Sequence, residues 1–317
     1  MGIHSGQQHT AYEDYAHLWE TAERLGLDWA SVFDHLLPIQ SDPAGPCFEG
    51  PALLAAMAAR TSRITCGIVV AGVTYRHPAL LANIAVTLDH VSAGRFELGM
   101  GAAWNDLEHR QYGIAFPPLG TRMEMLNEAV TIVRRLLTER EVTFDGQHYH
   151  LTGAHCEPKP MAPNGIPIWI GGAGERRTLP VVAQRADGWN TFLIPMESYR
   201  RKLGVLAEQC AASGRDLEDI RKALVFRAVL GETRAEAEDA LTERAAQLDV
   251  ERDQLAQSTL AATAEECIDL LRPYAQVGVE DFLLMARPPL MERTIEILAG
   301  QVAPALRTMS QDRTISV

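Results

Sequence analysis

The stretch PIWIGGAGERRTL (residues 167–179) joins a short apolar run to a charged, helix-forming run through three glycines. Gly171, Gly172 and Gly174 stand where a buried strand would end and a helix would begin. Glycine lets the backbone turn sharply and lets its N–H groups approach a ligand closely, and a helix N-terminus favours an anion. The stretch therefore predicts a strand, a tight turn and a helix, with a turn able to hold an anion.

The same alternation of strand and helix patterns runs through most of the chain. Its apolar runs are too continuous for half-exposed antiparallel strands, and eight of them are typical of a parallel (β/α)₈ barrel, or TIM barrel. A doubly wound open sheet is the alternative, but SGQQHT after the first strand is no G-x-G-x-x-G motif. The predicted strands cover residues 2–8, 28–35, 63–72, 95–101, 167–172, 187–192, 222–230 and 279–286.

The alternation is interrupted between the fourth and fifth predicted strands. About 65 residues intervene there, and they predict a helix around 123–137 and a hairpin that turns at residues 145–146. Capping boxes that begin at Thr233 and Thr263 predict two helices between the seventh and eighth strands. Because no fixed-period repeat or low-complexity linker divides the chain, we expect one domain over residues 1–317.

Composition favours small-molecule partners. The net charge is −12, from 41 acidic and 29 basic residues, which argues against a nucleic-acid surface or an anionic membrane surface. The five cysteines are scattered without a C-x-x-C pair, which fits a reducing compartment. No signal peptide and no membrane-spanning run is expected, so the sequence predicts a soluble, cytoplasmic protein.

The strand ends supply the candidate site. In a (β/α)₈ barrel the active site lies at the C-terminal ends of the strands, and loops after the later strands often hold phosphate. The predicted phosphate donors are the amides of five consecutive residues, with arginine adding charge: Gly172, Ala173, Gly174, Glu175 and Arg176. Alternatively, the glycines serve only the geometry of the turn. Pro180 would disrupt a helix that began at Glu175, so we expect a separate or kinked first turn.

Polar and aromatic residues also follow the second and fourth strands. Asp34 and His35 end the second strand, where they are either functional or simply a capped, solvated pair. Trp104 and Asn105 follow GMGAA at the end of the fourth strand, where Trp104 is either a wall for a flat ring or a core residue. The histidines and carboxylates do not assemble a metal-ligand set, so no metal site is predicted.

With these motifs placed, the chain resembles the luciferase-like monooxygenase family, and within it the oxidoreductases that use the deazaflavin coenzyme F420. The resemblance covers most of residues 30–190. It is carried by four stretches, which are SVFDHLLP (31–38), the run from YRHPALL to LNEAV (75–130), FDGQHYHL (144–151) and the run from IPIWIGG to ADGWN (166–190).

The resemblance implies a coenzyme ring across the strand ends, with its phosphate after the fifth strand. Asp34 and His35 then contact the ring or its redox-active edge, and a non-proline cis peptide in the third strand falls at Val69–Val70. In the sugar-phosphate dehydrogenases of this branch a glutamate after the fourth strand donates a proton, but Trp104 stands at that place here. The implied cofactor contacts besides the glycine turn are Val69, Val70, Ala102 and Asn105.

The leading hypothesis is an F420-dependent oxidoreductase that transfers a hydride between the deazaflavin and a small organic substrate. His35 is the predicted proton donor or ring-polarising group, and Asp34 and Trp104 complete the predicted catalytic set. The alternative within this scaffold is an FMN-dependent monooxygenase that uses reduced flavin and oxygen. A cofactor carrier without turnover and a metal enzyme are the remaining alternatives. We also expect a homodimer, formed through an apolar helix face.

Overall fold

Eight parallel strands form the centre of the computed structural model, which describes residues 1–39, 42–286 and 291–311. The barrel strands are β1 (Gly2–Ser5), β2 (Trp29–Val32), β3 (Thr65–Gly72), β4 (Phe96–Gly101), β7 (Ile168–Gly171), β8 (Gly188–Phe192), β9 (Arg221–Phe226) and β12 (Asp281–Met285). They close in the order β1-β12-β9-β8-β7-β4-β3-β2. The predicted (β/α)₈ barrel is therefore confirmed.

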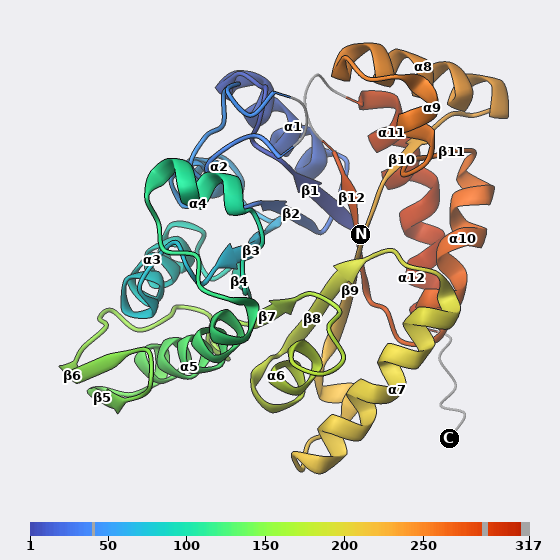
Figure 1. The fold of residues 1–317 in the computed structure, drawn as a ribbon. Coiled ribbons are helices and arrows are strands. Elements are labelled where there is room, and N and C mark those ends of the chain that lie inside the picture. The colour runs from blue at the N-terminus through green and yellow to red at the C-terminus, as the bar shows by residue number, and fades with distance from the viewer. Residues whose placement is uncertain (40–41, 287–290, 312–317) are drawn as a thin grey trace.

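Helices surround this barrel (Figure 1). Pro78 occupies the first position of its helix, where the missing N–H costs no hydrogen bond, and the side chain of His77 caps the same helix end. The outer helices are α1 (Tyr12–Arg24), α2 (Gly50–Arg60), α3 (Pro78–Val91), α6 (Thr178–Arg185), α7 (Met196–Ala212), α10 (Ala264–Gln276), α11 (Glu292–Ile297) and α12 (Ala303–Gln311), with the short 3-10 helix η1 (Leu217–Asp219) and the short π-helix η2 (Leu298–Val302).

The predicted insertion lies between β4 and β7. It holds α4 (Asp106–Tyr112), α5 (Leu119–Thr138) and an antiparallel hairpin of β5 (Val142–Asp145) and β6 (His150–Ala154), which extends beside α5 in Figure 1. The predicted helix and hairpin are confirmed, whereas α4 was not predicted. The side chain of Asn105 caps the start of α4, and Gly113 ends it with a left-handed φ of 67°.

The segment between β9 and β12 is more elaborate than predicted. The apolar run 222–230 is two strands, because β9 ends at Phe226 and β10 (Ala228–Leu230) leaves the barrel to pair with β11 (Leu260–Ala262). The two predicted capping residues, Thr233 and Thr263, do cap helices, namely α8 (Arg234–Leu248) and α10. A third helix, α9 (Arg252–Ala256), was missed because it is five residues long and has no side-chain cap.

Paired charges close the N-terminal end of the barrel. Arg221 donates to Glu97 at 2.9 Å and to Asp281 at 2.8 Å, and its guanidinium lies 4.9 Å from the ring centroid of Trp169. Trp169 in turn packs edge-on against Trp29 inside the barrel. This end is filled by packed aromatic rings and paired charges, which leaves the opposite end for a ligand. Within the described ranges, none of the helices has the length and apolar character that crossing a membrane requires.

Candidate active site

A histidine and a buried glutamate meet where β2 and β4 end. Nδ1 of His35 lies 2.7 Å from Oε1 of Glu108. Glu108 belongs to α4, and its side chain is fully buried, while His35 keeps 13% of its side chain exposed. The first turn of α4 follows β4 closely, so barrel closure brings this carboxylate to a histidine 73 residues away.

Four donors surround the Glu108 carboxylate. The backbone amides of Leu36 and Leu37 donate to Oε2 at 2.8 and 3.3 Å, and the Tyr75 hydroxyl donates to Oε1. Burial raises the pKa of Glu108, but the hydrogen bonds from His35, Tyr75 and Leu36 outweigh it, so the pKa lies below its ordinary value. An ionised carboxylate only accepts hydrogen bonds, so Nδ1 of His35 donates to Glu108, and in a neutral ring this leaves Nε2 as the acceptor nitrogen.

Two aromatic rings flank His35. The ring of Phe33 lies edge-on at 5.1 Å between centroids, and the ring of Trp104 does so at 5.2 Å. Trp104 is 63% exposed, so it is not a core residue. Its position beside His35 is compatible with a wall for a flat ligand.

Asp34 anchors the loop that follows β3. Its carboxylate accepts from Nη1 of Arg76 at 2.7 Å and from the Gly72 amide at 3.0 Å, and it is only 2% exposed. Burial raises the pKa of Asp34 to about 6, against the opposing effects of Arg76 and the Gly72 amide, so the group is ionised at pH 7. Both oxygens of Asp34 are therefore engaged in holding this loop.

The same loop holds α4 in place. His109 lies 2.6 Å from Oγ1 of Thr74 through Nε2 and 2.6 Å from the Asn105 carbonyl through Nδ1, and its ring stacks on Tyr75. The Asn105 side-chain oxygen accepts from the Leu107 amide at 3.2 Å, so this predicted cofactor contact has its oxygen engaged in capping. The carbonyl of Ala102, another predicted contact, accepts from Arg122.

The predicted cis peptide at Val69–Val70 is confirmed. Val69 packs on the cluster of Trp29 and Trp169 inside the barrel. The side chain of Val70 occupies space over β4 and β7 that larger residues would fill, because added Cβ atoms would lie 2.6 to 2.8 Å from it at Gly99, Gly101 and Gly171. The two valines thus lie inside the barrel toward the C-terminal ends of its strands.

The glycine turn after β7 presents several amides. Gly172 has a φ of 121°, and its own amide donates to the Asn190 carbonyl at 3.0 Å, which removes that amide from the predicted set. In the described part of the chain, the amides of residues 173–177 donate to no other group. As Pro180 led us to expect, α6 begins only at Thr178, so Pro180 falls in its first turn. A Cβ added at Gly174 would lie 2.9 Å from Oγ1 of Thr178.

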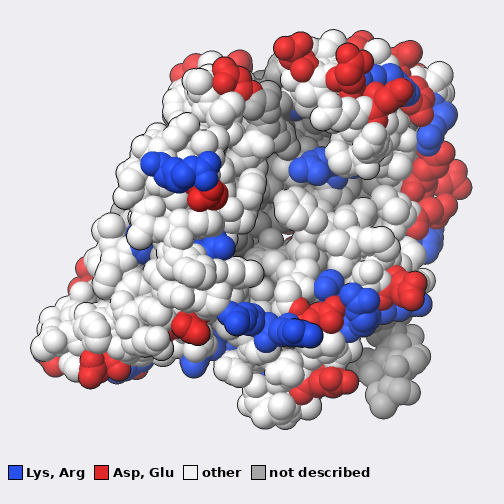
Figure 2. Space-filling model, in the orientation of Figure 1, with Lys and Arg blue, Asp and Glu red and all other residues white. Residues whose placement is uncertain are grey.

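Basic side chains gather around this turn. Figure 2 shows blue groups over the region of α6 and the start of α7, although acidic residues outnumber basic ones in the chain. The Glu175 carboxylate lies 3.0 Å from both Nε of Arg201 and Nζ of Lys202, and Lys202 also donates to the Ala173 carbonyl. These cations offset the one acidic side chain of the turn.

An unsatisfied acceptor lies nearby on β8. Asn190 is 8% exposed, and its Oδ1 has no hydrogen-bond partner among the residues that the structure describes. This oxygen lies 3.1 Å from the position of a Cβ added at Gly171. A buried amide oxygen is rarely left without a donor, so it fits a site that a polar ligand completes. Across the described residues, no three His, Cys, Asp or Glu side chains gather as a metal site.

Sequence reasoning missed Glu108, Tyr75, Arg76 and Asn190. A signal for Glu108 was available, because Asn105 and Gly113 are the capping and terminating residues of a short helix that places Glu108 in its first turn. The other three depend on contacts between distant segments, and no local pattern marks them.

The model of the luciferase-like monooxygenase family matches residues 1–248. The chain therefore belongs to this family, in agreement with the barrel, the cis peptide and the glycine turn.

Relatives and solved structures narrow the comparison. An F420-dependent glucose-6-phosphate dehydrogenase of Nocardia farcinica is 30% identical over 319 residues, covering 91% of this chain and 92% of that protein. An uncharacterised protein of Mycobacterium tuberculosis is 36% identical over 163 residues, which cover 51% of this chain and 56% of that protein. The chain thus matches little more than half the length of that relative. An F420-dependent secondary alcohol dehydrogenase, solved with an F420–acetone adduct, shares the fold at a TM-score of 0.83 and 21% identity, covering 96% of this chain and 98% of that one.

Proposed function

We propose that this protein is an F420-dependent oxidoreductase that transfers a hydride between the deazaflavin and a small organic substrate. The observation that carries the proposal is the hydrogen bond between Glu108 and His35 at the C-terminal ends of the barrel strands. It gives the histidine one defined tautomer at the end of the barrel where ligands of such folds bind.

The residues at this end fit the coenzyme. The amides of residues 173–177 and the nearby cations suit its phosphate, and the predicted contributors Ala173, Gly174, Glu175 and Arg176 all belong to this turn. The unsatisfied Oδ1 of Asn190 and the valines of the cis peptide suit a flat ring that carries a hydrogen-bond donor. When bound, F420 supplies a carbon centre that accepts or donates a hydride. The Nocardia relative, similar over nine tenths of this chain, is named for the same coenzyme.

In this proposal His35 transfers the proton that accompanies hydride transfer. When a hydride leaves an alcohol carbon, or is added to a carbonyl carbon, the substrate oxygen loses or gains a proton. Nε2 of His35 takes or returns that proton, while the Glu108 carboxylate holds Nδ1–H and stabilises the charged imidazolium. Asp34 keeps the loop of Tyr75 in place, and Trp104 covers the edge of the site.

The coenzyme is tested by titrating the protein separately with F420 and with FMN, and following absorbance and fluorescence. We expect F420 to bind at least about tenfold more tightly. The loaded protein is then offered secondary alcohols, ketones, activated alkenes and imines, with the change in deazaflavin absorbance as the readout. Tight binding of FMN alone, with oxygen consumption by the reduced flavin, would replace this proposal with a monooxygenase.

A further inference from the structure

We propose that a cavity beside the barrel mouth binds substrates that combine an apolar body with a carboxylate, and that Arg227 binds the carboxylate. The inference rests on the proposed function, because it specifies the substrate of the same site.

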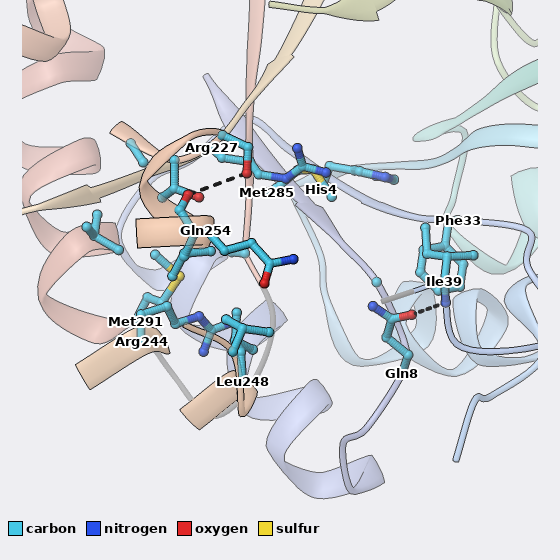
Figure 3. Close-up of a pocket in the computed structure, with 18 residues that line it drawn as sticks. His4, Gln8, Phe33, Ile39, Arg227, Arg244, Leu248, Gln254, Met285 and Met291 are labelled. Carbon is cyan, nitrogen blue, oxygen red and sulfur yellow. Dashed lines mark hydrogen bonds between the residues drawn. The ribbon is translucent and has the colours of Figure 1, made fainter. Parts of the chain in front are cut away.

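The cavity has a volume of about 300 Å³, which is at the lower end of the range of volumes found for ligand pockets. It lies between the α8–α9 segment and the ends of β1, β9 and β12 (Figure 3). Among the described residues that line it, none is acidic. Most of its wall is apolar, including Phe33, Ile39, Leu248, Leu255, Met285 and Met291.

The cavity lies next to the proposed catalytic His35, with Phe33 between them. Phe33 lines it and lies 5.1 Å from the His35 ring. Met285 also lines it and packs on the same cluster inside the barrel as Val69. A ligand in the cavity would therefore extend toward both the histidine and the cis peptide.

Arg227 brings a charge into this apolar space. Its guanidinium makes no hydrogen bond or ion pair with any residue that the structure describes, and the nearest aromatic face is that of Phe192, at 5.8 Å. The Arg227 side chain is partly buried, and this burial lowers its pKa because a cation loses favourable hydration in such a position. By contrast, Arg221 and Arg76 each contact two carboxylates. A partly desolvated cation without a counter-ion favours an anionic ligand.

Neighbouring groups leave Arg227 available. In Figure 3 its guanidinium points toward His4, while Arg244 and Met291 lie at the opposite end of the cavity. Nδ1 of His4 lies 3.0 Å from Oγ of Ser31, and burial, together with His35 and Arg227, lowers the pKa of His4 to about 4. His4 is thus neutral at pH 7 and adds no second charge beside Arg227.

The walls favour a carboxylate on an apolar body over a phosphorylated sugar. Sugar hydroxyls need several free polar partners. Polar side chains do line the cavity, but the Gln8 side-chain oxygen already accepts from the Ile39 amide at 2.7 Å and the Ser258 hydroxyl donates to the Leu255 carbonyl at 3.5 Å, while apolar residues form most of the wall. A guanidinium fork matches the two oxygens of a carboxylate, while aliphatic and aromatic walls bind the remainder of the ligand.

The test uses calorimetric titration with 3-phenylpropionate and its neutral analogue 3-phenylpropanamide, each with and without bound F420. In the unmodified protein we expect the acid to bind at least about tenfold more tightly than the amide. Arg227→Gln should remove that preference, and Arg227→Lys should retain most of it. Arg60→Gln, on the remote surface of α2, is the matched control and should change neither affinity.

Equal binding of acid and amide by the unmodified protein overturns the inference, and this comparison does not depend on any variant folding. Absence of binding by a series of alkyl and aryl carboxylates, or tighter binding of glucose 6-phosphate through Arg227, also overturns it. Failure of F420 to bind, with the acid preference intact, would instead contradict the proposed function and leave this inference standing.

Discussion

The two sides of the barrel mouth differ in how their charges are satisfied. Where β2, β3 and β4 end, the charged groups have partners, as in the Asp34–Arg76 ion pair and the Glu108–His35 hydrogen bond. Where β9 and β12 end, Arg227 has no carboxylate partner among the described residues and faces a largely apolar cavity. The first side is organised before any ligand arrives, whereas the second gains a charge partner only with an anionic ligand.

This difference suggests that one side of the barrel mouth serves the chemical step and the other side selects the ligand. Proton transfer needs fixed geometry, so a histidine whose tautomer is set by a buried carboxylate suits the chemical step. Ligand selection benefits from groups that only the right ligand satisfies, because the free energy lost by partly desolvating an unpaired cation is regained when an anion binds. Variants on each side should therefore affect different measured quantities.

The largest effect is expected for His35→Ala on the organised side. Turnover should fall about 10²-fold or more, because a positioned proton-transfer group is lost, while F420 affinity stays within a few-fold. Stopped-flow deazaflavin absorbance measures the rate, and His35→Asn keeps a hydrogen bond without titrating. If both variants weaken coenzyme binding and leave the rate of the bound complex unchanged, His35 only packs against the ring.

Glu108→Gln should lower the rate by about 10- to 100-fold. Glutamine has one accepting oxygen where the carboxylate has two, so it cannot accept from the Leu36 amide and from Nδ1 of His35 through separate oxygens, and it carries no charge to stabilise an imidazolium. Tyr75→Phe is the matched control, because it removes one hydrogen bond to Glu108 and leaves the bond to His35 intact. Equal rates for Glu108→Gln and Tyr75→Phe would contradict the orienting role of the carboxylate.

His4, which lies between the two sides, is expected to affect stability rather than rate. Its pKa is lowered from the ordinary value of 6.5 to about 4, so the folded protein keeps the ring neutral where the unfolded chain takes up a proton. This contribution is fully present above about pH 6.5 and is lost as the pH falls toward 4, up to about 3 kcal/mol. Urea unfolding across this pH window gives the free energy of unfolding of the unmodified protein and of His4→Gln. The difference between the two free energies should become smaller as the pH falls. Parallel curves would refute the assignment.

The smallest effect is expected at the glycine turn. Gly174→Val should weaken F420 binding several-fold, because its side chain would meet Oγ1 of Thr178 and hinder backbone approach to the phosphate. Gly204→Val on α7 is the control, since a Cβ added there meets no atom within 4 Å. Unchanged coenzyme affinity in Gly174→Val would remove this turn from the coenzyme site.

Prediction from the sequence succeeded where the signal was local. The apolar runs located the eight barrel strands, Pro180 indicated the late start of α6, and the residues around 145–146 indicated the hairpin. The predicted secondary structure was incomplete where short strands and helices follow one another. The run 222–230 does not show that the chain leaves the barrel at Arg227, because apolar residues stand on both sides of Arg227 with no glycine or proline between them.

The sequence by itself therefore determined the parallel barrel, the glycine turn after the fifth barrel strand and the family resemblance that locates Val69–Val70, because these follow from periodicity and motifs within short segments. Only the tertiary structure decided that Glu108, rather than Asp34, contacts His35 and that Arg227 lacks a carboxylate partner among the described residues. The physical reason is that barrel closure brings together side chains far apart in sequence. Burial and hydrogen bonding then determine which of them are charged, paired or left available to a ligand.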